Sequence, residues 1–305
     1  MSRKGIFIFL TGKDLHMRTA IVTDTNSGLS VEEGKQLGIY VLPMPVIIEN
    51  KSYLEGIDIT HEQLYDAMRE KKNISSSQPS PGNVTELWDL VFRDGYEEIV
   101  YIPMSSGLSG SCQNASQYAL DYNGKVQVVD NHRISLTLRE SVLDAKALSN
   151  QGLCAADIKK TLEKNAFNAS IYITVNSLEY LKKSGRVTPA AAAIANVINL
   201  KPILTIQGER LDSFAKTRGM KQAEKKMLEA LKADIHDRFS NVPANRIRVG
   251  AAGTFETPNA ASEWYLAIRS TFPEYESYYL PLSCSIACHV GINAAGLAVC
   301  VLDRE

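Results

Sequence analysis

Short apolar runs alternate with helix-like stretches along the first half of the chain. Residues 20–24 form an apolar, β-branched run that ends in polar residues, and a helix-like stretch follows at 31–37. Residues 98–104 form another such run, and a loop rich in glycine and serine connects it to a helical pattern at 112–120. Strands that alternate with helices in this way predict a parallel sheet.

A second step from strand to helix is predicted between these two units. An apolar run at 39–48 is interrupted by Pro43 and Pro45. Thr60 then stands where it can cap a helix that begins at His61.

The alternation starts again at residues 171–175, which suggests a second α/β domain. An alanine-rich helix is predicted at 190–200, with Thr188 as its N-cap. Residues 201–206 and 210–216 are predicted to form paired strands. A chain of 305 residues is also longer than one hydrophobic core usually organises, and ligands tend to bind where two domains meet.

These patterns predict an α/β protein of two α/β domains with a ligand between them. The N-terminal domain, residues 17–170, is expected to contain a mainly parallel sheet, and the C-terminal domain, residues 171–305, a mixed one. Residues 1–16 are interpreted as a leader or tag-derived segment, because the strand pattern opens just after Met17. The apolar run at 5–12 is short and has no small-residue cleavage site, so we do not expect export.

Charge and cysteine content narrow the class of function. The formal net charge is −1, from 33 basic and 34 acidic residues, so the broad attraction that nucleic-acid binders need for phosphates is missing. The five cysteines are an odd number in a large core-forming chain, which favours reduced thiols over a disulfide framework. We therefore expect a cytoplasmic protein that does not bind nucleic acid.

The loop at residues 105–111 is the most informative segment for function. It joins an apolar strand to a helix, and its hydroxyls and backbone amides suit an anion such as a carboxylate or a phosphate. Gly107 and Gly110 would let a ligand approach the backbone. The alternative is that its serines only cap the helix and shape the turn.

Two further segments are weaker candidates for a site. The hydroxyl cluster at 75–82 reads as a loop with a helix start at Pro81 and Gly82. His289 lies among small and apolar residues, where a lone histidine is more often a core residue than a catalyst. The cysteine spacing fits neither haem attachment nor a structural zinc site, so no metal and no cofactor are expected.

Several motifs in order give the chain a resemblance to the DegV family from about Met17 to about Leu302. They are IVTDTNS at 21–27, SSQPSPG at 76–82, SSGLSGSCQ at 105–113, YLKKSGRV at 180–187 and KPIL at 201–204. The resemblance implies a FakB-like protein that binds one long-chain fatty acid. Loop hydroxyls and a histidine would hold the carboxylate, and the tail would be buried.

Carried onto this chain, the resemblance names specific residues. Ser76 stands where the family usually has threonine, Ser77 follows it, and Ser105 or Ser106 would supply the next hydroxyl. His289 matches the histidine of the closing motif His-x-Gly-Pro-Gly, although the proline and the second glycine are absent here. Arg186 and Arg218 match basic residues that would serve the head group or partner docking, and the alternative is that they are ordinary solvated charges.

The resemblance also implies a partner and a role. A separate fatty acid kinase would phosphorylate the bound acid to an acyl phosphate for phospholipid synthesis, with transient membrane contact, and this chain would not be an enzyme. Ile194, Val197, Ile198 and Leu200 of the alanine-rich helix could contribute to an apolar tunnel, although core packing is the commoner role for any single one of them. The competing interpretation is a small-molecule phosphotransferase or hydrolase that uses the serine-rich loop and His289.

Overall fold

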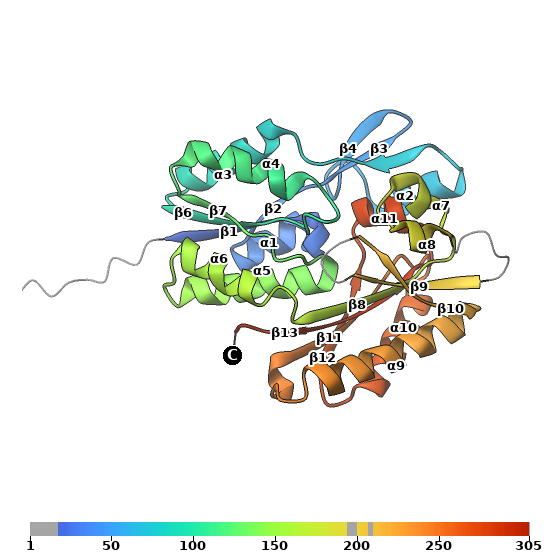
Figure 1. The fold of residues 1–305 in the computed structure, drawn as a ribbon. Helices are drawn as coiled ribbons and strands as arrows, with labels where there is room; N and C mark the ends of the chain where they lie inside the picture. The colour runs from blue at the N-terminus through green and yellow to red at the C-terminus, as the bar shows by residue number, and fades with distance from the viewer. Residues whose placement is uncertain (1–17, 194–199, 207–209, 305) are drawn as a thin grey trace, which may run out of the picture.

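The computed structural model describes residues 18–193, 200–206 and 210–304 (Figure 1). Within these residues the strands form a four-stranded, a six-stranded and a three-stranded sheet. None of the helices in this part of the chain combines the length and the apolar character needed to span a bilayer. The interpretation of residues 1–16 as a leader lies outside the described residues.

The four-stranded sheet is parallel, with strand order β2-β1-β6-β7. Its strands are β1 (Thr19–Asp24), β2 (Tyr40–Leu42), β6 (Glu98–Ile102) and β7 (Val126–Val128). Its helices are α1 (Val31–Leu37), α3 (Pro81–Arg93), α4 (Ser111–Tyr118), α5 (Ser135–Asn150) and α6 (Ala155–Lys164). Ile21 packs on the side of α5 and α6, whereas Ala20 and Val22 pack on the side of α3 and α4. Because both faces of β1 are covered, its sequence is a continuous apolar run.

The apolar run at 39–48 is divided between two sheets. Pro43 separates β2 from β3 (Pro45–Ile48), which lies in a small antiparallel sheet of order β4-β3-β5. The other members are β4 (Lys51–Leu54) and β5 (Ile74–Ser76). Helix α2 (His61–Arg69) begins at the predicted cap, where the Thr60 side chain accepts from the amide of Gln63. This small sheet and α2 share a core cluster with α11 (Cys284–Val290).

The six-stranded sheet is mixed, with strand order β10-β9-β8-β13-β11-β12. Its strands are β8 (Ala169–Thr174), β9 (Leu200–Ile206), β10 (Asp212–Arg218), β11 (Ile247–Gly253), β12 (Glu276–Pro281) and β13 (Ala295–Val301). Helices α9 (Met220–Arg238) and α10 (Pro258–Thr271) cover one face. On the other face, Ile173 and Leu204 join a cluster with Leu108 and Ile134 from the first half of the chain. A parallel sheet and a mixed sheet, each with helices, confirm the predicted fold class.

The predicted second-half elements are mostly present, with one correction. The paired strands are β9 and β10, which are antiparallel. Two short helices, α7 (Glu179–Ser184) and α8 (Pro189–Ala193), precede them. The predicted helix at 190–200 is wrong at its end, because Leu200 begins β9 and pairs with Arg218. Residues 194–199, including the tunnel candidates Ile194, Val197 and Ile198, lie outside the described residues.

Candidate functional site

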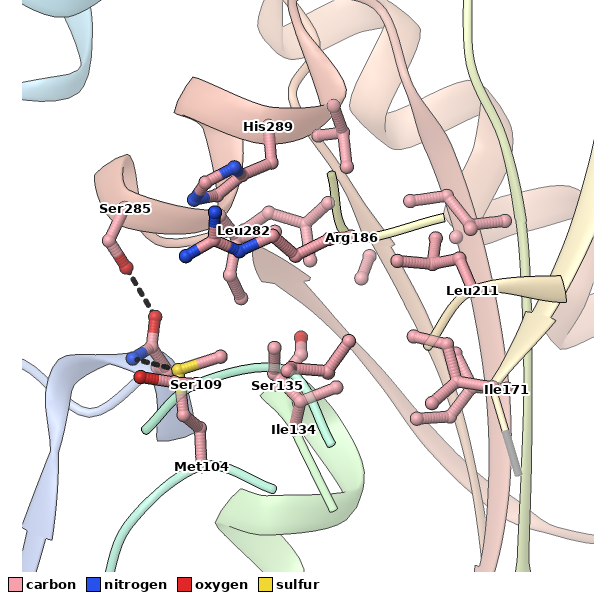
Figure 2. Close-up of a pocket in the computed structure, with 18 of the residues that line it drawn as sticks. Met104, Ser109, Ile134, Ser135, Ile171, Arg186, Leu211, Leu282, Ser285 and His289 are labelled. Atoms are coloured by element: carbon pink, nitrogen blue, oxygen red, sulfur yellow. Dashed lines mark hydrogen bonds between the residues drawn. The ribbon is translucent and has the colours of Figure 1, made fainter. Parts of the chain in front are cut away.

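A cavity lies between the carboxyl ends of the parallel strands and the inner face of the mixed sheet (Figure 2). The loops after the four parallel strands contribute Asn26, Met44, Met104 and Ile134. The mixed sheet contributes Ile171 and Ile173 of β8, Ile206 of β9 and Leu297 of β13. Ligands of α/β proteins commonly bind outside the carboxyl ends of parallel strands, and this cavity has mainly apolar walls. It therefore suits a largely apolar ligand.

Ser76 and His289 meet at one end of the cavity. The Ser76 Oγ lies 2.7 Å from His289 Nε2, although the residues are 213 positions apart. Ser76 is the last residue of β5, and His289 lies in α11. Ile74 and Cys288 belong to the core cluster that packs these two elements together. Apolar packing between the small sheet and α11 thus fixes the polar pair.

Burial lowers the pKa of His289 to about 4, and the positive charge of Arg186 lowers it as well. The imidazole is therefore neutral at pH 7 and carries one proton. Its Nδ1 is buried and has no hydrogen-bond partner among the described residues. A proton on Nε2 avoids a buried, unpaired N–H, which would cost about 1–3 kcal/mol. In that tautomer Nε2 donates to Ser76 Oγ, and the Ser76 hydroxyl keeps its own proton for a ligand oxygen.

Arg186 lies at the cavity, and Arg218 does not. Arg186 is half-buried and lines the cavity, and Figure 2 shows its guanidinium directed toward the His289 ring. Its Nη1 donates to the carbonyl oxygen of Ser184. Arg218 is exposed at the end of β10 and is not among the described residues that line this cavity. Of the two predicted arginines, Arg186 is thus placed to supply positive charge beside the neutral His289.

The serine-rich loop contributes a different hydroxyl from the ones predicted. Ser77 lines the cavity beside Ser76, and from the loop at 105–111 Ser109 does so. Ser105 and Ser106 are not among the described lining residues. The Ser105 hydroxyl accepts from the amide of Gly107, and the Ser106 amide donates to Asp130. Hydrogen bonds within the protein thus occupy the Ser105 hydroxyl and the Ser106 amide.

Asn26 and Ser285 are lining residues that the sequence did not single out. The Asn26 side-chain oxygen accepts from the hydroxyls of Ser283 and Ser285, and its amide nitrogen lies 3.1 Å from the Met104 sulfur. Asn26 belongs to the motif at 21–27, which was a signal that could have identified it. This network attaches the end of β1 to the start of α11 and so fixes the helix that carries His289.

Glu55, His61 and Cys284 form a group near α11 whose ligand atoms lie within 4.8 Å of one another. Such residue types can hold a metal ion. Here the Glu55 carboxylate accepts from the Thr25 hydroxyl at 2.7 Å and from the amide of Cys284 at 2.5 Å. His61 Nε2 lies 2.9 Å from the carbonyl oxygen of Leu282. Glu55 therefore satisfies the first amide of α11, and the group is explained by packing and helix capping.

Comparison with known proteins identifies the family. The DegV family model matches residues 18–302. A DegV domain-containing protein of Listeria innocua is 30% identical over 93% of this chain and 98% of its own length. One of Deinococcus radiodurans is 34% identical over 68% of this chain and 74% of its own length.

Two solved structures show the same fold. A DegV family protein from Thermus thermophilus, whose structure is described as showing fatty acid binding, is 28% identical with a TM-score of 0.84. The alignment covers 94% of this chain and all of the other. A stearic acid-binding protein from Eubacterium ventriosum is 22% identical with a TM-score of 0.83, over 93% of this chain and 98% of the other, and so shows the fold alone. With the family match spanning almost all the described residues, the chain belongs to the DegV family.

Proposed function

We propose that this protein binds one long-chain fatty acid and does not transform it. The observation that carries the proposal is an apolar cavity with the Ser76–His289 pair at one end. An amphipathic anion matches that arrangement, with its carboxylate at the pair and its chain along the apolar walls. The fatty acid binding described for the Thermus thermophilus relative supports the same assignment.

The apolar walls would supply most of the affinity. A chain of roughly fifteen methylenes gains about 0.8 kcal/mol for each one buried, or on the order of 12 kcal/mol before the costs of ordering. The ionised head group opposes burial unless donors replace its water. We assign that task to the hydroxyls of Ser76 and Ser77 and to Arg186, while the N–H of His289 is donated to Ser76 and orients that hydroxyl toward the carboxylate. Ser105 and Ser106, which the family resemblance suggested, would act by shaping the loop that carries Ser109.

The Ser76–His289 contact also resembles the nucleophile and base of a hydrolase, so catalysis was the alternative. A relay of that type needs a third group that accepts from the other ring nitrogen and orients the imidazole. Among the described residues, none accepts a hydrogen bond from His289 Nδ1. Binding without turnover needs no such third group, so it accounts for the Ser76–His289 contact better than a catalytic relay does.

We further propose a separate fatty acid kinase as the partner, which would phosphorylate the presented carboxylate for phospholipid synthesis. Gln78, which lines the cavity beside Ser77, is exposed, and Ser76 and Ser77 are half-buried. The head-group end is thus the part of the site that a second protein would reach most directly. Arg218, exposed on β10, is kept as a candidate docking residue together with Arg186.

Native mass spectrometry of the purified protein tests the proposal. We expect a stoichiometric adduct with the mass of a fatty acid, which added ATP leaves chemically unchanged. Ser76→Ala and His289→Ala should each weaken fatty acid binding about tenfold or more, because the first removes a hydrogen bond to the charged carboxylate and the second removes the group that orients the Ser76 hydroxyl. Ser270→Ala, an exposed serine on α10, is the matched control. A ligand-free protein that also ignores added fatty acids would contradict the proposal.

A further inference from the structure

Some polar side chains that line the cavity have a hydrogen-bond partner within the protein, and others do not. Ser285 donates to Asn26, and the Ser109 hydroxyl accepts from the amide of Ser111. Two buried side-chain atoms of the lining residues have no partner among the described residues, namely His289 Nδ1 and Ser135 Oγ. His289 belongs to the head-group end already described. Ser135 is thus a second polar group that the site has not yet explained.

Ser135 is buried and faces the cavity. It is 9% exposed, and Figure 2 shows its oxygen directed into the cavity from the side opposite His289. Its neighbours in the chain, Ile134 and Leu136, are apolar and line the same cavity. The hydroxyl therefore lies where the chain of a fatty acid would pass, at a distance from the carboxylate end.

The backbone at Ser135 adds to this polarity. Ser135 is the first residue of α5, a helix of 16 residues whose N-cap, Ile134, provides no side-chain hydrogen bond. Its φ is +53°, in the left-handed region that costs energy for a residue other than glycine. The positive end of the α5 dipole and an unpaired hydroxyl thus face an otherwise apolar wall.

We propose that Ser135 is a second binding contact and that the preferred ligand is a fatty acid with a hydroxyl or oxo group along its chain. This inference rests on the proposed fatty acid binding. A plain alkyl chain leaves the buried Ser135 hydroxyl unsatisfied, whereas an oxygen on the chain pairs with it. A second carboxylate does not fit, because the cationic lining residue, Arg186, lies at the head-group end beside His289.

Binding of stearic acid and of its 3-hydroxy, 10-hydroxy and 12-hydroxy derivatives tests the inference, by displacement of a fluorescent fatty acid. We expect one isomer to bind about fivefold more tightly than stearic acid, and its position reports the depth of Ser135. In Ser135→Ala and Ser135→Gly this preference should fall to about onefold. Glycine suits the positive φ, so the second variant removes the hydroxyl without added strain. Ser270→Ala should keep the preference.

The outcomes separate this inference from the proposed function. If stearic acid binds and no hydroxylated isomer binds better, or if the preference persists in both Ser135 variants, the Ser135 contact is overturned while fatty acid binding stands. If the wild-type protein binds none of the four acids, both are overturned.

Discussion

His289 connects the stability of the protein to pH. Its pKa is about 4 in the folded chain, against an ordinary value of 6.5. Between these values the unfolded chain binds a proton that the folded chain does not, so the free energy of unfolding falls as the pH falls from about 6.5 to about 4. The full difference corresponds to on the order of 3 kcal/mol.

Urea unfolding of the wild-type protein and of His289→Gln, at about pH 7.5 and about pH 4.5, measures this contribution. We expect the wild-type protein to lose on the order of 2 kcal/mol more than the variant between the two conditions. Asp24 acts in the opposite direction, because burial raises its pKa to about 6, but it is present in both proteins and cancels. Equal losses would show that His289 is not held neutral by burial.

At the residue scale the sequence located part of the lining. Ser76, Ser77, Arg186 and His289 line the cavity, and their contacts with a ligand stay a prediction. The loop at 105–111 was identified, but not which of its hydroxyls faces inward, since backbone contacts decide that. No sequence pattern identified Ser135 as a lining residue, because a serine before an amphipathic helix usually indicates an N-cap. Only the fold shows that it faces an apolar cavity.

Strand β11 and helix α5 pack closely at Gly250, which links the mixed sheet to the cavity. A Cβ added at Gly250 would lie 1.7 Å from the Leu136 Cδ1. Leu136 lines the cavity, so Gly250→Ala should displace it, destabilise the protein by about 1–3 kcal/mol and weaken fatty acid binding. Urea unfolding and ligand displacement measure the two effects.

Gly296→Ala on the adjacent strand β13 is the matched control. A Cβ there would meet its nearest atoms, in Ala252, at 3.5 Å, which is ordinary contact distance. We expect its free energy of unfolding to stay within about 0.5 kcal/mol of the wild-type value. Similar losses in both variants would mean that strand conformation, not the contact with Leu136, limits position 250.

Elements with a clear period and a capping residue were predictable, and the small sheet was not. The helix after Thr60 begins where the cap predicts. The run at 39–48 is apolar throughout, and nothing local shows that Pro43 sends its two halves to different sheets. The pairing of β3 with β5 depends on packing against α11, which is far away in the sequence.

At the scale of the whole molecule, Arg304 attaches the segment after β13 to helix α5. Its guanidinium contacts Glu140 and Asp144, whose side chains are 1% and 0% exposed. Arg304→Ala would leave two buried carboxylates short of a partner, so we expect a loss of about 3 kcal/mol in the free energy of unfolding.

Lys225→Ala serves as the comparison in the same unfolding experiment. Its ion pair with Glu229 has side chains that are 78% and 64% exposed, so removing it should cost less than about 0.5 kcal/mol. If Arg304→Ala costs no more than Lys225→Ala, the contacts of Arg304 do not hold the two halves together.

The order of strands and helices along the chain was predictable because its signals are local. The first half alternates strand and helix, and the mixed sheet begins at β8, next to the boundary expected at residue 170. The extents of the two domains stay a prediction. How the halves pack was not predictable, since α5 contacts strands of both large sheets through side chains far apart in sequence.

The position of β13 in the mixed sheet has a consequence for biosynthesis. β13 lies between β8 and β11, so it joins the group β10-β9-β8 to the pair β11-β12. It is also translated after all the other strands described here. The two groups of strands therefore emerge from the ribosome before the strand that pairs with both of them, while the parallel sheet can already fold. Leu297 of β13 lines the cavity, so we expect the cavity walls to be complete only after this strand has been translated.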